Sequence, residues 1–179
     1  MPKVNNNYLM HIYRQFITLA HIFKIMTKTI EIINKQRAAL LKLTEDLTIE
    51  QLNIVPAGFN NNIIWNLGHL VAAQQGICYR RAGVDILITE DYYNTYGPGS
   101  KPERFITATE LEEIKSLFTS TIDQFVADYD KKLFSNYTAW ATRAGIDLTN
   151  IDEASQFVIF HEGLHFGVIN AQRRVVLGL

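Results

Sequence analysis

The chain has 179 residues, of which 47% are hydrophobic, and its formal net charge is −1. This length and composition fit one globular domain with a sizeable core. No cluster of Lys and Arg indicates binding to nucleic acid, and no apolar run reaches the length of a membrane span. The single cysteine, Cys78, excludes an intramolecular disulfide and agrees with a reducing compartment. We therefore expect a cytoplasmic protein that binds neither nucleic acid nor a membrane.

The first 28 residues do not have the pattern of a signal peptide. Polar residues such as His11, Arg14 and Lys24 interrupt every apolar run, and no small-residue cleavage site follows them. Two interpretations remain open. The segment is either a loose amphipathic helix or an upstream extension of a protein whose natural start is Met26. We accordingly divide the chain into an N-terminal extension, residues 1–28, and one domain, residues 29–179.

Four long segments carry apolar residues at helical spacing and are predicted to be helices. They cover about residues 29–43, 63–81, 107–131 and 152–177. A capping-box pattern at Thr48 predicts a short helical turn between the first two. No segment alternates polar and apolar residues as a strand does. The sequence therefore predicts an all-α four-helix bundle.

Two long connections, residues 85–104 and 134–151, join these helices. Connections of this length in a compact domain are often functional or cross over the bundle. In the first, Tyr92, Tyr93 and Tyr96 precede a run rich in Gly and Pro, which excludes regular structure in that run. The tyrosines favour a segment that packs on the bundle as a lid.

His161 and His165 are four residues apart on the last predicted helix. Their side chains are therefore separated by about 40° around the axis and one turn along it, so both imidazoles can reach one point. This arrangement is half of a site for a divalent metal, although two isolated histidines at this spacing are more often ordinary core or surface residues. The apolar flanks, with Phe160 and Leu164 as predicted core positions, indicate that the pair is buried. Two buried imidazoles so close together need a shared partner or a metal.

The segment His161-Glu-Gly-Leu-His165 also matches the H-E-x-x-H pattern of zinc proteases, in which the glutamate is the base. The residues after His165 contain no Asp, Glu or His that could complete such a site, and we reject this interpretation. Three roles remain open for Glu162. It could orient a ligand imidazole, act as a base, or face solvent, and the last is favoured because a glutamate on a helix is usually exposed.

His69, in the middle of the apolar second helix, is the candidate for the third ligand. Mid-helix positions lie at similar heights in an antiparallel bundle, so His69 could face the other two histidines. Ala72, Ala73 and Gly76 lie on its side of the helix and leave room for another helix or a ligand. Three histidines would leave an open coordination position, as catalytic sites do. Cys78 lies on the opposite side and is interpreted as a core residue.

The segments from Asn62 to Leu70 and from His161 to His165 resemble the two signature segments of the DinB-like (DinB/YfiT) superfamily, over roughly residues 29–179. The resemblance implies an up-down-down-up four-helix bundle and a divalent ion held by His69, His161 and His165. Zinc and nickel are the metals we expect first at such a site, and iron is a further candidate. Several members are homodimers. Many relatives have a Gly-Gln step after the second histidine of the pair, whereas Val168 takes the place of that glutamine here, with Gln172 as a polar substitute.

The resemblance also implies a function. Characterised members include S-transferases that use bacillithiol or mycothiol, and a thiol-dependent maleylpyruvate isomerase. The first hypothesis is therefore an enzyme in which a metal-activated low-molecular-weight thiol attacks a small electrophile held under the tyrosine segment. The second is a non-enzymatic metal-binding or stress-response module that acts through a protein partner. The third is a structural bundle without metal.

Overall fold

The computed structural model describes the backbone of residues 6–179 and the side chains from residue 24 onward. The helices are α1 (Asn6–Thr44), α2 (Ile49–Asn53), α3 (Ile63–Gln74), α4 (Glu90–Tyr96), α5 (Ala108–Asp130) and α6 (Ile151–Val176). A π-helical turn, Gln75–Tyr79, and a 3-10 turn, Arg80–Ala82, continue α3. Two short strands, β1 (Trp140–Ala141) and β2 (Asp147–Leu148), precede α6.

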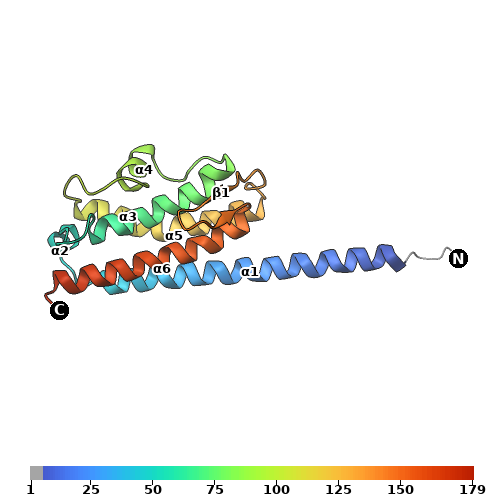
Figure 1. Cartoon of the computed structure of the whole chain (residues 1–179), viewed down its shortest axis with the longest axis horizontal. Helices are drawn as coiled ribbons and strands as arrows, with labels where there is room; N and C mark the ends of the chain where they lie inside the picture. Colours follow the sequence, from blue (N-terminus) through green and yellow to red (C-terminus); the bar gives the residue numbers. More distant parts are fainter. Residues whose placement is uncertain (1–5) are drawn as a thin grey trace.

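The four long helices form a bundle (Figure 1). Helices α1 and α6 run in one direction, and α3 and α5 run in the other. Helix α1 packs against α5 and α6, and α3 packs against the same two helices from the other side. Because α3 and α5 are parallel, the chain between them must cross the length of the bundle. The predicted all-α fold is confirmed, and its direction pattern is up-down-down-up.

Helix α3 is the central element of the bundle. All of its residues are buried, as expected for a helix that is apolar around most of its circumference. It begins where the Asn62 side chain accepts a hydrogen bond from the Trp65 amide at 2.9 Å. The helical run ends at Gly83, whose φ of 69° is the left-handed conformation that glycine adopts readily. The sequence predicts this end correctly, but it does not distinguish the π-helical turn from an α-helix.

Both long connections contain short elements that the sequence analysis did not predict. Residues 85–104 include α4, and residues 134–151 include an antiparallel hairpin in which Trp140 pairs with Leu148. The expectation of no strand is wrong at this hairpin, because two residues per strand are too few to show an alternating pattern. Helix α1 also begins at Asn6, before the predicted start at residue 29. The division of the chain after residue 28 stays a prediction.

Helix α4 packs closely on α3 through its tyrosines. Tyr92 and Tyr96 are buried, and the Tyr92 hydroxyl donates to the Gly68 carbonyl at 3.3 Å. A Cβ atom at Gly68 would lie only 2.5 Å from the Tyr96 ring, and one at Gly76 would lie 2.6 Å from the Tyr93 hydroxyl. The two glycines therefore permit this approach, and the predicted packing of the tyrosine segment on the bundle is confirmed.

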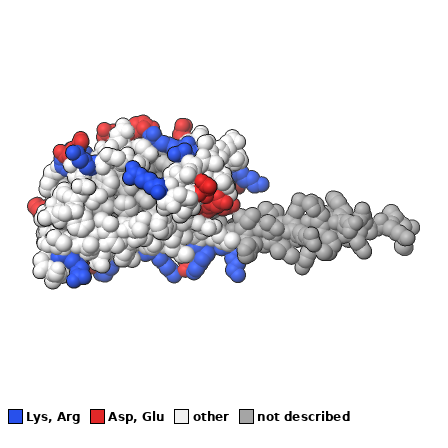
Figure 2. All heavy atoms as spheres, viewed as in Figure 1, with Lys and Arg blue, Asp and Glu red and all other residues white. Residues whose placement is uncertain are grey.

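The surface agrees with the balanced composition. Basic and acidic side chains are interspersed on the face in Figure 2 and do not gather into a large patch of one sign. Among the described residues, none of the helices combines the length and apolar character needed to cross a membrane.

Candidate metal centre

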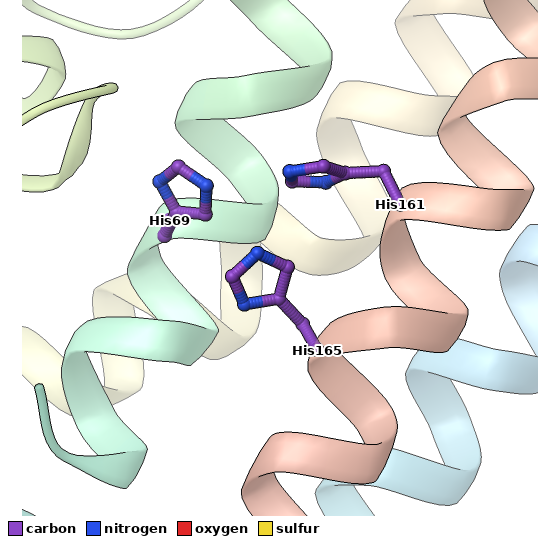
Figure 3. Close-up of side chains that lie close together, drawn as sticks. All are labelled: His69, His161 and His165. Carbon is purple, nitrogen blue, oxygen red and sulfur yellow. The ribbon is translucent and has the colours of Figure 1, made fainter. Parts of the chain in front are cut away.

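Three histidines from two helices converge near the middle of the bundle. His69 projects from α3, and His161 and His165 project from successive turns of α6 toward it (Figure 3). The centroid of the His69 ring lies 5.3 Å from that of His161 and 4.7 Å from that of His165, and the latter two are 4.6 Å apart. The structure thus brings together all three residues that the sequence analysis selected.

The ring nitrogens fit a divalent ion. One nitrogen from each ring lies within 4.8 Å of the corresponding nitrogens of the other two. Zinc–nitrogen bonds of about 2.0–2.1 Å place tetrahedral ligand atoms roughly 3.4 Å apart, so small side-chain rotations close the remaining distance. Three imidazoles suit zinc, nickel, iron or copper by ligand type. These residues can hold a metal and would leave a coordination position open.

The His69 ring is held from two sides. Its Nδ1 lies 2.7 Å from the carbonyl oxygen of Tyr96 in α4, and its ring stacks on Trp65 with centroids 4.7 Å apart. A carbonyl oxygen only accepts hydrogen bonds, so Nδ1 carries the proton and Nε2 has the free lone pair. Since His69 is only 7% exposed, it forms the buried side of the centre.

His161 and His165 form the solvent side of the centre. Both are half-buried, so the predicted burial of this pair is only partly correct. The reason lies in their neighbours on α6. Phe160 and Leu164, predicted to be core residues, are 49% and 54% exposed, because the buried stripe of α6 is narrower than its apolar sequence indicates. One side of the centre therefore borders the surface.

Burial favours the neutral form of all three imidazoles. Desolvation lowers the pKa of His165 to about 3 and that of His161 to about 4, with further lowering by the neighbouring histidines. Desolvation also lowers the pKa of His69, partly offset by its hydrogen bond to the Tyr96 carbonyl. Neutral rings at pH 7 have the lone pairs that a metal requires.

Glu162 does not face solvent, and that favoured interpretation is wrong. The side chain is fully buried, and its Oε1 accepts a hydrogen bond from Arg37 Nε of α1 at 2.8 Å. Arg37 also donates to the Phe118 carbonyl at 2.9 Å and to the Thr121 hydroxyl at 3.3 Å. Burial raises the pKa of Glu162, and the Arg37 guanidinium opposes that shift. The glutamate thus joins α6 to α1 and, through Arg37, to α5, and its complete burial in an ion pair with Arg37 argues against a role as base.

Cys78 is a core residue, as interpreted from its position. It is 1% exposed, and burial raises the pKa of its thiol to about 12. At neutral pH the Cys78 side chain therefore stays protonated, and its burial keeps reactants away from it. The Tyr96 ring packs directly against Gly68, so α4 lies close against α3 beside the centre. His161 and His165 are half-buried and form the side of the centre that borders the surface.

Sequence reasoning missed Asn66, which contacts the centre directly. Its Oδ1 lies 2.7 Å from Nδ1 of His165, and its amide nitrogen donates to Gln172 Oε1 at 3.1 Å. An amide in the middle of an apolar helix was the available signal, since buried polar groups require partners. Gln172, the suggested polar substitute, does lie in this network.

The fold and the site define a class of protein: a mainly helical four-helix bundle with three histidines that could hold a divalent ion. Comparison with known families agrees with this class. A family described as the DinB superfamily matches residues 32–169, and the chain belongs to that superfamily. The matched range contains all three histidines and ends before Gln172. No curated protein matches the chain.

Proposed function

We propose that the protein is a metal-dependent enzyme that uses a low-molecular-weight thiol to transform a small electrophile, by S-transfer or by thiol-assisted isomerisation. The observation that carries this proposal is the asymmetry of the three-histidine centre. His69 is buried, whereas His161 and His165 are half-buried and border exposed surface. A structural metal site is closed by protein ligands, whereas a catalytic one keeps a position for a small molecule.

The residues around the centre support a thiol as the second component. A divalent ion held by the three histidines would lower the pKa of a coordinated thiol and so supply a thiolate at neutral pH. The chain itself cannot provide that thiol, because Cys78, its single cysteine, is buried and has a pKa of about 12. Phe160 and Leu164 flank the two outer histidines and are exposed, so they offer an apolar surface for the body of the substrate.

The exposed apolar residues of α6 also support a second candidate function. Phe160, Leu164 and Val175 are each about half exposed, and such side chains often mark protein interfaces. A metal-binding or stress-response module would use this surface for a protein partner. The homodimer expected from the family resemblance would do the same with a second copy.

Elemental analysis and a thiol assay test the proposal together. Protein purified without added metal should contain about one zinc, nickel or iron ion per chain, and the His69→Ala variant should contain far less. Wild type should consume a thiol in the presence of an electrophile, and His69→Ala should not. Cys78→Ser is a matched control, because it removes the only protein thiol without touching the centre.

The possible results separate the candidates. Equal metal content in wild type and His69→Ala would refute the three-histidine site. Tight metal binding without thiol consumption, across a panel of electrophiles, would favour the module that acts through a protein partner. Circular dichroism of each variant establishes that the bundle is folded.

A further inference from the structure

Behind His165 lies a buried network of amide side chains. Asn66 in α3 and Gln172 in α6 are both fully buried. Asn66 Nδ2 donates to Gln172 Oε1 at 3.1 Å, to the Asn62 carbonyl at 2.8 Å and to Asn61 Oδ1 at 3.0 Å. Gln172 Nε2 donates to the Asn61 carbonyl at 2.7 Å and to Asn61 Oδ1 at 2.9 Å. The network therefore joins α3, α6 and the segment that precedes α3.

The backbone carbonyls determine the direction of every bond in this network. The Asn61 carbonyl can only accept, so the amide nitrogen of Gln172 must face it and Gln172 Oε1 must face Asn66. The Asn62 carbonyl likewise requires the amide nitrogen of Asn66. The Oδ1 of Asn66 is then the atom that faces His165 Nδ1, at 2.7 Å. Because that oxygen can only accept, His165 must carry its proton on Nδ1.

We infer that Asn66 and Gln172 are positioning residues that hold His165 in the tautomer protonated at Nδ1. This tautomer leaves the lone pair on Nε2, the nitrogen needed for the metal. Without the network an imidazole is free to carry its proton on either nitrogen, and its ring is free to turn. Outer partners of this kind typically change metal affinity by about 10–100-fold when they are removed. The inference rests on the proposed metal site, but the tautomer itself can be measured without metal.

Nuclear magnetic resonance of metal-free protein labelled with ¹⁵N-histidine tests the tautomer. In wild type, His165 should carry its proton on Nδ1. In Asn66→Leu, which removes the acceptor, the proton should move wholly or partly to Nε2. His69 is an internal control, because its partner is the Tyr96 carbonyl, which the substitution leaves in place. A wild-type His165 protonated on Nε2, or an unchanged tautomer in Asn66→Leu, would overturn the inference.

Zinc affinity, measured by competition with a chelator, is the second readout. Asn66→Leu should bind zinc about 10–100-fold more weakly than wild type. Ser155→Ala is the matched control on α6, because Ser155 is buried and donates to the Asp152 carbonyl, outside the network. This control should keep both the tautomer and the affinity of wild type. Loss of zinc affinity to the same extent in Ser155→Ala would show a general effect on folding and would overturn the assignment.

Gln172→Leu keeps the inference testable if Asn66→Leu does not fold. This variant removes one of the partners that orient the Asn66 amide but retains the Asn62 carbonyl. We expect a mixture of His165 tautomers and a smaller loss of zinc affinity, and an unchanged pure tautomer would contradict the role of Gln172. Neither readout uses a thiol. If wild type binds neither zinc, nickel nor iron, the proposed function fails while the tautomer result stands.

Discussion

The close approach of α4 to α3 can be tested by adding one methyl group at Gly68. In Gly68→Ala the new Cβ would lie 2.5 Å from Cδ1 and 2.6 Å from Cγ of Tyr96. Rotation of the Tyr96 side chain cannot relieve this contact easily, because Cγ is bonded directly to Cβ and moves little when the side chain rotates. The ring is also confined, since Tyr96 is only 4% exposed. The substitution must therefore displace α4. That movement would also withdraw the Tyr96 carbonyl from His69.

The net cost follows from two opposing effects. Overpacking of a well-filled core costs about 1–3 kcal/mol. Replacing glycine by alanine inside a helix stabilises it by about 1 kcal/mol. Because the clash involves the fixed part of the ring, we expect the upper end of the packing cost and a net loss of about 1–2 kcal/mol in the free energy of unfolding.

Urea denaturation of the metal-free variants measures this difference. Gly167→Ala is the matched control. The same substitution in α6 places a Cβ with no described atom within 4 Å outside the adjacent helix backbone, and it should stabilise the protein by about 1 kcal/mol. Gly76→Ala should lie between the two, since its clash is with the Tyr93 hydroxyl at the end of a side chain. If Gly68→Ala is as stable as Gly167→Ala, the reasoning about α4 is refuted.

Three further predictions concern the buried ion pair, pH and capping. Glu162→Leu leaves the Arg37 guanidinium buried without its carboxylate and should cost about 3–5 kcal/mol in denaturant unfolding, whereas a double variant with Arg37→Met should recover most of that loss. Metal-free protein should lose stability as the pH falls below 6.5 toward 4. Folding lowers the histidine pKa from the ordinary 6.5 to about 4 at His161 and about 3 at His165. In this pH range the unfolded chain therefore binds more protons than the folded protein does. Each histidine contributes a slope of up to about 1.4 kcal/mol per pH unit, and thermal unfolding that is independent of pH in this range would contradict the prediction. Thr107→Ala removes the capping box of α5 and should cost about 1 kcal/mol, which unchanged thermal stability would exclude.

The long helices could be predicted because their apolar spacing persists over many turns. The burial of α3 and its end at Gly83 follow directly from local sequence. Helix α4 and the hairpin are too short for a period to emerge, and they form only because the bundle offers a surface to pack on. The exposure of Phe160 has a related cause. Apolar character alone does not say whether a neighbouring helix covers a given position.

The convergence of the three histidines could be predicted for two reasons. Two of them share one face of a helix, and the middles of packed helices lie at similar heights in a bundle. The surroundings of the centre could not be predicted in this way. Glu162 is buried by a contact with Arg37, 125 positions away in the chain, and no local pattern marks that pairing. Asn66 was overlooked because its partner Gln172 lies beyond the signature segments.

The division of the three histidines between α3 and α6 has a consequence for folding. An unfolded chain retains His161 and His165 as near neighbours, but His69 joins them only when the two helices have docked. A complete three-imidazole environment therefore exists only in the assembled bundle. The absorption spectrum of cobalt, which responds to the number and geometry of its ligands, would follow the docking of these two helices as a separate event from the formation of helical backbone.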